Sequence, residues 1–250
     1  QVREKKEITS MSRAAASLAK NVFRQKIREA EKVAVYNEYI DKKDEMVIGT
    51  VESVKDKFTL ISLGKTVALL SKSAEIPHEK LTEGQSIRVV ITDVQKETKG
   101  SQVLVSRADA TLVKRLFEKE VPEIYQGVVE IKSIAREAGE RTKLAVFSED
   151  KNVDPVGACV GNKGDRVNRI VDELNGEKID IITWDADPVK FITNALAPAK
   201  VEEIIIDEEE KIANVKVKED QLSLAIGKKG QNVRLAARLT GWKIDIKAAE

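Results

Sequence analysis

One short pattern occurs twice in this chain of 250 residues and constrains its fold more than any other feature. Residues 157–170 read GACVGNKGDRVNRI, and residues 223–236 read SLAIGKKGQNVRLA. Each copy has a small apolar run, a glycine, two polar residues, a second glycine and then a segment with helical periodicity. The corresponding glycines, Gly161 with Gly227 and Gly164 with Gly230, lie 66 positions apart. This regular spacing predicts a duplicated structural unit.

The residues around each turn keep the same register and outline the unit. Asp154 and Asp220 both stand seven positions before the first glycine, where each is expected to cap the N-terminus of a short helix. The apolar periodicity predicts the order helix, strand, strand, helix, helix, strand over residues 109–186 and again over residues 187–250. The predicted fold class is therefore multidomain α+β, with two tandem α-β-β-α-α-β units.

The residues before the duplicated unit predict two further parts. Residues 12–40 have the periodicity of a long helix, which either ends a domain that begins upstream, at residues 1–43, or is a solvated linker. Residues 44–108 contain five short β-branched runs, which predict a barrel of OB type, with an SH3-like barrel as the alternative. The last two strands are expected to join through a hairpin loop at residues 96–100. Because the sequence starts without methionine, we expect a fragment of a longer protein.

Composition restricts the classes of function. The formal net charge is +1, so binding to a polyanion requires that the charges be segregated along the chain. Residues 221–250 hold six bases and two acids, whereas residues 201–220 hold eight acids and three bases. The single cysteine and the single histidine exclude an intrachain disulfide and a zinc cluster, and they fit a reducing cytoplasm. The sequence has no apolar run long enough for a membrane span and no secretory signal pattern.

The glycine turns suggest that the chain binds phosphate groups. In a tight G-x-x-G turn between two helices, main-chain N–H groups face outward, and the missing side chains let a phosphate approach them. Four residues between the glycines add donors and positive charge: Asn162, Lys163, Lys228 and Lys229. The alternative is a plain helix–helix connection, which two basic copies in matching units make less favourable.

Sequence patterns for catalysis are sparse. Residues 162–165 spell the guanine-reading motif of GTPases, but the phosphate-binding loop that must accompany it is missing, since Thr59 occupies the place of its first glycine. His78 lies in a polar loop and Cys159 in an apolar run, so we expect a solvated residue and a small core residue. The acids at residues 207–210 are expected at a hairpin tip. These patterns require no enzyme, cofactor or metal.

These features carry a resemblance to known families. A repeated α+β unit with basic residues in its glycine turn resembles the type II KH domain, and residues 44–108 resemble the S-one type of OB-fold RNA-binding domain. One such barrel followed by two KH domains is similar to the NusA family of bacterial transcription elongation and termination factors. The segments LFEKEVPEIYQGVVEIKSIAREAGERTKLAV and DPVGACVGNKGDRVNRIVDELNGEKIDII also resemble that family closely. Residues 1–43 resemble the last helix of its polymerase-binding N-terminal domain.

The resemblance implies RNA binding in the cytoplasm without enzymatic activity. It implies association with RNA polymerase, mainly through the N-terminal domain, and with single-stranded nascent RNA, so that pausing, termination and antitermination are modulated. Other antitermination factors are further implied partners, and a membrane is not. The implied RNA contacts are Gly161, Asn162, Lys163, Gly164, Arg166, Arg169, Gly227, Lys228, Lys229, Gly230, Asn232, Arg234 and Arg238. An apolar groove beside the turns would use Val160, Val167, Ile226 and Val233, which equally suit a buried core.

The order of the domains argues against two other classes of RNA-binding protein. An accessory module of RNA degradation would place the KH domain before the barrel, the reverse of the order here. A ribosome-assembly factor built from KH domains is also disfavoured by this order.

On the barrel, Phe58 shares its face mostly with Leu60, Val67 and Leu69, so we expect the barrel to contribute charge and rigidity more than base stacking. The short link at residues 184–188 and the apolar segment 194–201 predict that the two KH units form one rigid body, which would bind about eight nucleotides.

Overall fold

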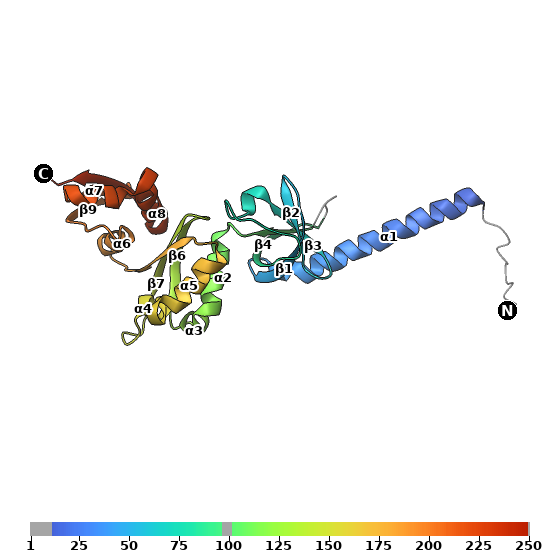
Figure 1. Ribbon diagram of the computed structural model, residues 1–250, viewed down its shortest axis with the longest axis horizontal. Helices are drawn as coiled ribbons and strands as arrows, with labels where there is room; N and C mark the ends of the chain where they lie inside the picture. The colour runs from blue at the N-terminus through green and yellow to red at the C-terminus, as the bar shows by residue number, and fades with distance from the viewer. Residues whose placement is uncertain (1–11, 97–101, 250) are drawn as a thin grey trace.

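The computed structural model describes residues 12–96 and 102–249. Figure 1 shows an elongated molecule in which a long helix, a barrel and two α+β units follow one another in chain order. Within the described ranges, no helix is both long enough and apolar enough to cross a membrane. Since the parts are joined end to end, the junctions between them decide how their surfaces are placed.

The N-terminal helix α1 (Arg13–Tyr39) confirms the predicted long helix. Its N-cap is Ser12, whose Oγ accepts a hydrogen bond from the main-chain N–H of Ala15 at 3.2 Å. Most of α1 is exposed and extends away from the barrel (Figure 1), whereas Tyr39 is 5% exposed and joins the barrel core. The helix is therefore anchored at its C-terminal end, where the short helix η1 (Ile40–Lys42) leads into the barrel.

Five strands form a closed barrel, with the short helix η2 (Lys72–Ala74) before the fourth. The strands are β1 (Met46–Val54), β2 (Phe58–Ser62), β3 (Val67–Ser71), β4 (Ser86–Val94) and β5 (Val103–Ser106). Their order is β1-β2-β3-β5-β4, where β1 pairs with both β2 and β4, and β3 pairs with β5 in parallel. This is the predicted OB arrangement rather than the SH3-like alternative. The expected hairpin loop lies, apart from Lys96, outside the described residues.

The two α+β units have the same element order, except that the first has an additional short helix, α3. The first contains α2 (Ala110–Glu120), α3 (Pro122–Tyr125), β6 (Glu130–Glu137), β7 (Arg141–Phe147), α4 (Pro155–Val160), α5 (Asp165–Glu173) and β8 (Lys178–Thr183). The second contains α6 (Pro188–Ala195), β9 (Glu203–Asp207), β10 (Ile212–Val217), α7 (Glu219–Ile226), α8 (Gln231–Thr240) and β11 (Lys243–Ala248). In each sheet the central strand pairs antiparallel with the strand before it and parallel with the last one. The duplication predicted from the 66-residue spacing is confirmed.

One expected helix cap is wrong. Asp154 caps α4, since its side chain accepts from the N–H of Val156, but Asp220 lies inside the first turn of α7, whose N-cap is Lys218. The difference follows from Pro155 at the first position of α4. Proline disfavours the helical conformation in the residue before it, so α4 cannot begin earlier. Gln221 in the second copy imposes no such limit, and α7 extends two residues further upstream.

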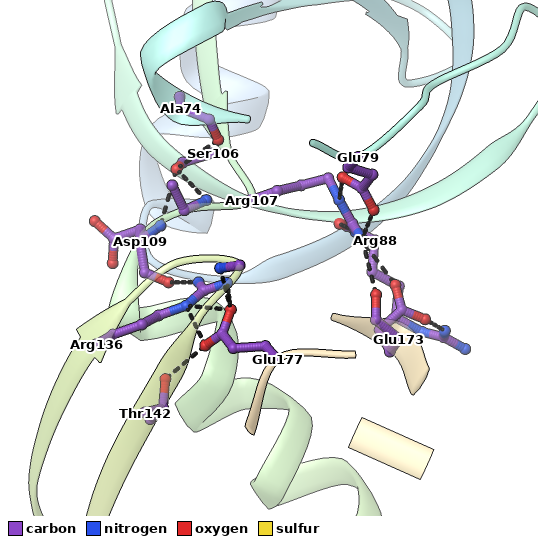
Figure 2. A network of polar contacts seen from close by, with 12 residues as sticks. Ala74, Glu79, Arg88, Ser106, Arg107, Asp109, Arg136, Thr142, Glu173 and Glu177 are labelled. Carbon is purple, nitrogen blue, oxygen red and sulfur yellow. Dashed lines mark hydrogen bonds and ion pairs between the residues drawn. The ribbon is translucent and has the colours of Figure 1, made fainter. Parts of the chain in front are cut away.

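A buried arginine joins the barrel to the first α+β unit. The Arg107 side chain is 2% exposed, and its guanidinium donates to both carboxylate oxygens of Glu79 at 2.6 and 2.8 Å. It also donates to the carboxylate and the carbonyl of Glu173, at 3.2 and 2.9 Å, and to the carbonyl of Arg88 at 2.6 Å. Glu79 follows β3, whereas Glu173 ends α5, so one side chain bridges the two parts (Figure 2). Nothing in the sequence pattern had predicted this residue to be buried.

A second buried ion pair lies beside it in the first unit. Arg136 and Glu177 have side chains that are 2% and 0% exposed, and they form a bidentate contact at 2.9 Å on each arm. Glu177 also accepts from the hydroxyl of Thr142 at 2.5 Å and from the N–H of Gly139 at 2.9 Å. Arg136 donates to the carbonyl of Asp109 at 2.6 Å, which connects this pair to the segment that leaves the barrel (Figure 2).

A continuous hydrophobic core joins the two α+β units, which agrees with the expected packing. Ala135, Ala145 and Ile182 of the first unit lie in the same buried cluster as Phe191 and Ile192 of α6. The cluster also takes in residues of the apolar segment 194–201. Across this junction the buried ammonium of Lys143 donates to the carbonyl of Ala197 at 2.9 Å, and burial lowers the pKa of Lys143. The two units therefore share apolar packing as well as a polar contact.

We predict that Arg107→Met lowers the free energy of unfolding by about 3 kcal/mol or more, because Glu79 and Glu173 would keep their buried carboxylates without a guanidinium between them. Urea denaturation followed by circular dichroism measures the change. The matched control is Arg24→Met on the exposed part of α1, which is expected to change the free energy of unfolding by less than about 0.5 kcal/mol. Equal effects of the two substitutions would contradict this role of Arg107.

Candidate nucleic-acid interface

The two glycine turns have the same backbone conformation. Each forms a short helical turn between two α-helices, η3 (Asn162–Gly164) and η4 (Lys228–Gly230). The first glycines have φ and ψ of 78° and 180° in Gly161 and of 77° and 169° in Gly227. The lysine in the third position is left-handed in both turns, with φ of 52° in Lys163 and 54° in Lys229. The duplicated sequence thus encodes a duplicated and unusual main-chain geometry.

The first position of each turn requires glycine for two reasons. Its φ and ψ lie in a region that other residues essentially do not adopt. In addition, a Cβ on Gly227 would lie 2.8 Å from the main-chain nitrogen of Asn232, and a Cβ on Gly161 would lie 2.7 Å from Cγ of Arg166. The second helix of each pair therefore approaches the turn too closely for any side chain. The turn can therefore keep this shape only with glycine at its first position.

Arg166 and Asn232, two of the predicted RNA contacts, occupy the same position of the two copies and lie behind the turn. Arg166 Nη1 donates to the carbonyl of Ala158 at 2.7 Å and to Glu123 at 2.8 Å. Asn232 is 3% exposed, and its Nδ2 donates to the carbonyls of Ala225 at 3.0 Å and Leu196 at 3.1 Å. Both side chains tie the second helix of the pair to the first. Their placement indicates that they hold the shape of the turn.

The lysines of the turns are exposed and free of carboxylates. Lys163, Lys228 and Lys229 have no ion-pair partner among the residues that the structure describes. Each turn also leads directly into the N-terminus of a helix, α5 or α8, where the helix dipole favours an anion. The two copies differ here, because Asp165 puts a carboxylate in the first turn of α5, whereas α8 starts with the neutral Gln231. The second turn and the start of its helix therefore carry more positive charge of their own.

The remaining predicted arginines already have acidic partners. Arg169 lies 3.4 Å from Glu120, while Arg234 and Arg238 lie 2.6 and 3.6 Å from Glu137. The hydrogen bond from Arg234 is the main cause that lowers the pKa of the Glu137 carboxyl from its usual value. Some N–H donors of these arginines are therefore occupied by carboxylates, and only the remaining donors are available to a ligand. Lysines and arginines of the site thus have different roles.

The structure adds acidic residues that the sequence analysis missed. A cleft of about 400 Å³ lies between the hairpin that joins β6 to β7 and the second glycine turn. Its walls are formed by Glu137, Ala138, Glu140, Lys228, Lys229, Gln231 and Arg234. The two walls are more than 80 residues apart in sequence, so local pattern could not have predicted their contact. The second turn therefore faces an acidic part of the first unit.

Other residues singled out in the sequence are placed as follows. The four apolar residues predicted beside the turns are all partly exposed and therefore not fully buried in the core. They are the half-buried Val160, Val167 and Val233, and Ile226, which is 36% exposed. Cys159 is fully buried, which confirms a core residue, and burial raises the pKa of its thiol to about 12.

His78 is exposed, as expected for a solvated loop residue. The acids from Asp207 form a turn between β9 and β10, and no group of metal-ligating side chains occurs in the described part of the chain.

On the barrel, Phe58 and Leu60 alternate with buried residues along β2 and therefore share its outer face, next to Val67 and Leu69 of β3. All four side chains are half-buried. One aromatic ring among three aliphatic side chains offers little area for stacking.

The fold and the site define a class of protein. Two α-β-β-α-α-β units, each with a G-x-x-G turn between two helices, are tandem type II KH domains, and here they follow an OB-type barrel. Models of the NusA-like first KH domain and the NusA-like second KH domain match residues 107–184 and 188–250. The chain belongs to the NusA family.

The chain is similar over nearly its whole length to curated relatives named "Transcription termination/antitermination protein NusA". It is 56% identical over 236 residues to the relative from Bacillus subtilis (strain 168), with 94% of this chain and 64% of the relative covered. It is 53% identical to the relative from Halalkalibacterium halodurans, with 94% and 62% covered. It is 48% identical to the relative from Thermus thermophilus, with 96% and 62% covered. The chain thus spans slightly less than two thirds of the length of these relatives, whose name is that of a transcription factor and not of an enzyme.

We predict that the two glycines of the second turn respond differently to asparagine. Gly230 has φ and ψ of 73° and 16°, a left-handed conformation that asparagine adopts, so Gly230→Asn is expected to cost less than about 1 kcal/mol of unfolding free energy. Gly227→Asn is expected to cost about 2 kcal/mol or more, because it adds a collision with the main chain of Asn232 to an unfavourable dihedral. Thermal and chemical denaturation measure both. A larger loss for Gly230→Asn would contradict the geometry.

Proposed function

We propose that this chain is the RNA-binding part of a cytoplasmic transcription factor that associates with RNA polymerase and with single-stranded nascent RNA, and that modulates pausing, termination and antitermination. One observation carries the RNA-binding part of the proposal. Two turns with matching dihedral angles present lysine ammonium groups, free of carboxylates, beside helix N-termini on two units that share a core. Membership of the NusA family and the name of the relatives support the role in transcription.

Within the proposed site, we assign direct phosphate contacts to the turns. The residues concerned are Gly161, Asn162, Lys163 and Gly164 in the first KH domain, residues 109–186, and Gly227, Lys228, Lys229 and Gly230 in the second, residues 187–250. Arg166 and Asn232 act from behind by fixing the turn. Arg169, Arg234 and Arg238 share their donors between a carboxylate and the RNA. Each KH domain clamps about four nucleotides, so a strand of about eight would contact both turns.

The barrel at residues 44–108 contributes mainly a rigid attachment in this proposal. It is locked to the first KH domain through Arg107, whereas its outer face offers one aromatic ring. Association with RNA polymerase would involve the part of the protein that includes α1, residues 1–43. Apolar side chains exposed on α1, such as Phe23 at 71% and Leu18 at 67%, are consistent with a role in such contacts.

We predict that Lys228→Asp combined with Lys229→Asp weakens binding to single-stranded RNA. The weaker binding is expected from charge reversal beside the phosphate, and the dependence of log Kd on log salt should flatten by roughly 0.7 for each phosphate that the variant no longer neutralises. Folding should be nearly unaffected, because both side chains are exposed and aspartate tolerates the left-handed conformation of Lys229. Fluorescence anisotropy with a labelled ten-nucleotide RNA, repeated at several salt concentrations, measures both effects.

Two controls accompany this variant. Asn162→Asp combined with Lys163→Asp should weaken binding less, because only one charge is reversed and Asp165 already reduces the potential at that turn. Lys20→Asp combined with Arg24→Asp makes the same charge change on the exposed surface of α1 and should leave the RNA affinity nearly unchanged. Should the Lys228 and Lys229 variant melt normally and bind RNA like the unaltered chain, the turns would be helix connectors only.

A second prediction addresses transcription itself. In a stalled elongation complex of bacterial RNA polymerase, the emerging transcript should crosslink to this chain on ultraviolet irradiation, and the crosslinked peptides should include the two glycine turns. The variant with aspartate at 228 and 229 should lose crosslinks at the second turn. Crosslinking of free RNA but not of the emerging transcript would support RNA binding and argue against the transcriptional role.

A further inference from the structure

We propose that Glu137 of the first KH domain is a positioning residue for the second glycine turn, which it holds in place so that one RNA strand can contact both turns. The inference deepens the proposed function and rests on it. It concerns a residue that is outside the helices and turns which contact RNA in the proposed site. Glu137 acts through α8, with no contact to the RNA required.

Glu137 is the last residue of β6, and its carboxylate is contacted by three side chains of α8. Arg234 donates to both of its oxygens, from Nε at 2.6 Å and from Nη2 at 3.0 Å. Gln231 Nε2 donates to it at 2.9 Å, and Arg238 Nη1 lies 3.6 Å away. Gln231, Arg234 and Arg238 are three and four residues apart, so they form one face of α8, directed at the first KH domain. The carboxylate is 17% exposed, whereas the side chains of Arg234 and Arg238 are 42% and 54% exposed, so the contact lies at the edge of the junction and its role rests on its geometry.

The same arginine continues the connection into the turn. Arg234 Nη1 donates to the main-chain carbonyl of Lys229 at 3.0 Å, while its other two nitrogens contact Glu137. One planar guanidinium therefore connects the carboxylate of the first KH domain to the main chain of the second turn. Because a guanidinium has a fixed donor geometry, movement of Glu137 relative to α8 would also disturb the turn.

The other end of this connection is anchored in the first domain. Glu137 follows Arg136, which is buried in the ion pair with Glu177. Glu177 also accepts from the N–H of Gly139 in the hairpin next to Glu137. The hairpin is thus attached to the interior of the first domain at the end of β6 and within the turn. Glu177 thus holds the backbone of the hairpin that carries Glu137, and hydrogen bonds then run from Glu137 through Arg234 to Lys229.

The first glycine turn is held differently. Arg166 and Arg169 of α5 contact Glu123 and Glu120, which belong to α3 and α2 of the same domain. Among the described residues, α8, which follows the second turn, is held by a carboxylate of the other KH domain, whereas the arginines of α5, which follows the first turn, contact carboxylates of their own domain. The shared apolar core fixes the two domains together, and Glu137 fixes the helix that begins at the second turn. A strand that spans both turns depends on this placement, whereas a strand bound to one turn does not.

The test compares Glu137→Ala with Glu140→Ala, using a four-nucleotide and a ten-nucleotide RNA. Glu140 is the matched control, since it lies in the same cleft, contacts Gln231 at 2.6 Å and acts on Arg234 through its charge, but forms no hydrogen bond or ion pair with Arg234 or Arg238. Both substitutions remove one negative charge near Lys228 and Lys229. For Glu137→Ala we expect about tenfold weaker binding of the long RNA and less than about twofold change for the short one. Once the long RNA is bound at the first turn, a second turn that is less well placed binds the same strand with a lower effective concentration, whereas the short RNA needs only one turn. For Glu140→Ala both affinities should stay within about twofold.

A distance measurement gives a readout that RNA affinity alone cannot supply. Spin labels at Asp172→Cys and Lys243→Cys would report the separation of the two domains, and both positions are exposed. The native thiol of Cys159 does not compete for the label, because it is fully buried and its pKa is raised to about 12. The distance distribution should broaden in Glu137→Ala and stay narrow in Glu140→Ala.

The outcomes separate this inference from the proposed function. If the unaltered chain binds neither RNA, the proposed function fails. If the unaltered chain binds the long RNA more tightly and Glu137→Ala changes both RNAs alike, or neither of them, the positioning role is overturned while RNA binding stands. Equal loss of long-RNA affinity in Glu140→Ala would also overturn it, since the effect would then follow the charge of the cleft and not the contact with α8.

Discussion

The arrangement of the molecule depends on a guanidinium that is buried between two folded parts. Arg107 lies at the end of the barrel, and it contacts a carboxylate of the barrel and another of the first KH domain. A buried charge is tolerated only when its donors are satisfied, and here the guanidinium makes five hydrogen bonds to carboxylate and carbonyl oxygens. Any rotation between the two parts would break several of them together. The barrel therefore has one preferred orientation on the KH domains, because alternatives would leave charges buried without partners.

The same physical principle is repeated along the chain. The pair of Arg136 and Glu177 lies beside Arg107, and the ammonium of Lys143 crosses to the second KH domain. Apolar packing supplies cohesion at the second junction, but apolar contacts are not directional and permit small shifts. Buried polar contacts add direction, since their geometry is narrow. The elongated molecule in Figure 1 is thus a series of folded parts whose relative orientation is specified by a few charged side chains.

At the glycine turns, the basic residues have two different roles. Lysines lie on the outside of the turns with no carboxylate partner in the described chain, and a flexible ammonium suits contact with a moving phosphate. Arg166 and Asn232 lie behind the turns, where they bond to main-chain carbonyls and hold the helices, and Arg234 holds the carbonyl of Lys229. In the sequence, bases are concentrated in residues 221–250 and acids in the adjacent residues 201–220. The folded chain instead places acids of the first domain next to bases of the second.

The sequence by itself determined the local structure. The spacing of the glycines, the apolar periodicity and the turn residues were enough for the long helix, the barrel and the two KH units, because these patterns act between neighbours in the chain. The tertiary structure alone decided which charged residues are buried and which are paired. Arg107 and Asn232 are buried, and Arg234 is held by a glutamate 97 positions away. These outcomes depend on contacts between distant segments and on the removal of water from them, and neither leaves a period or a motif in a single sequence.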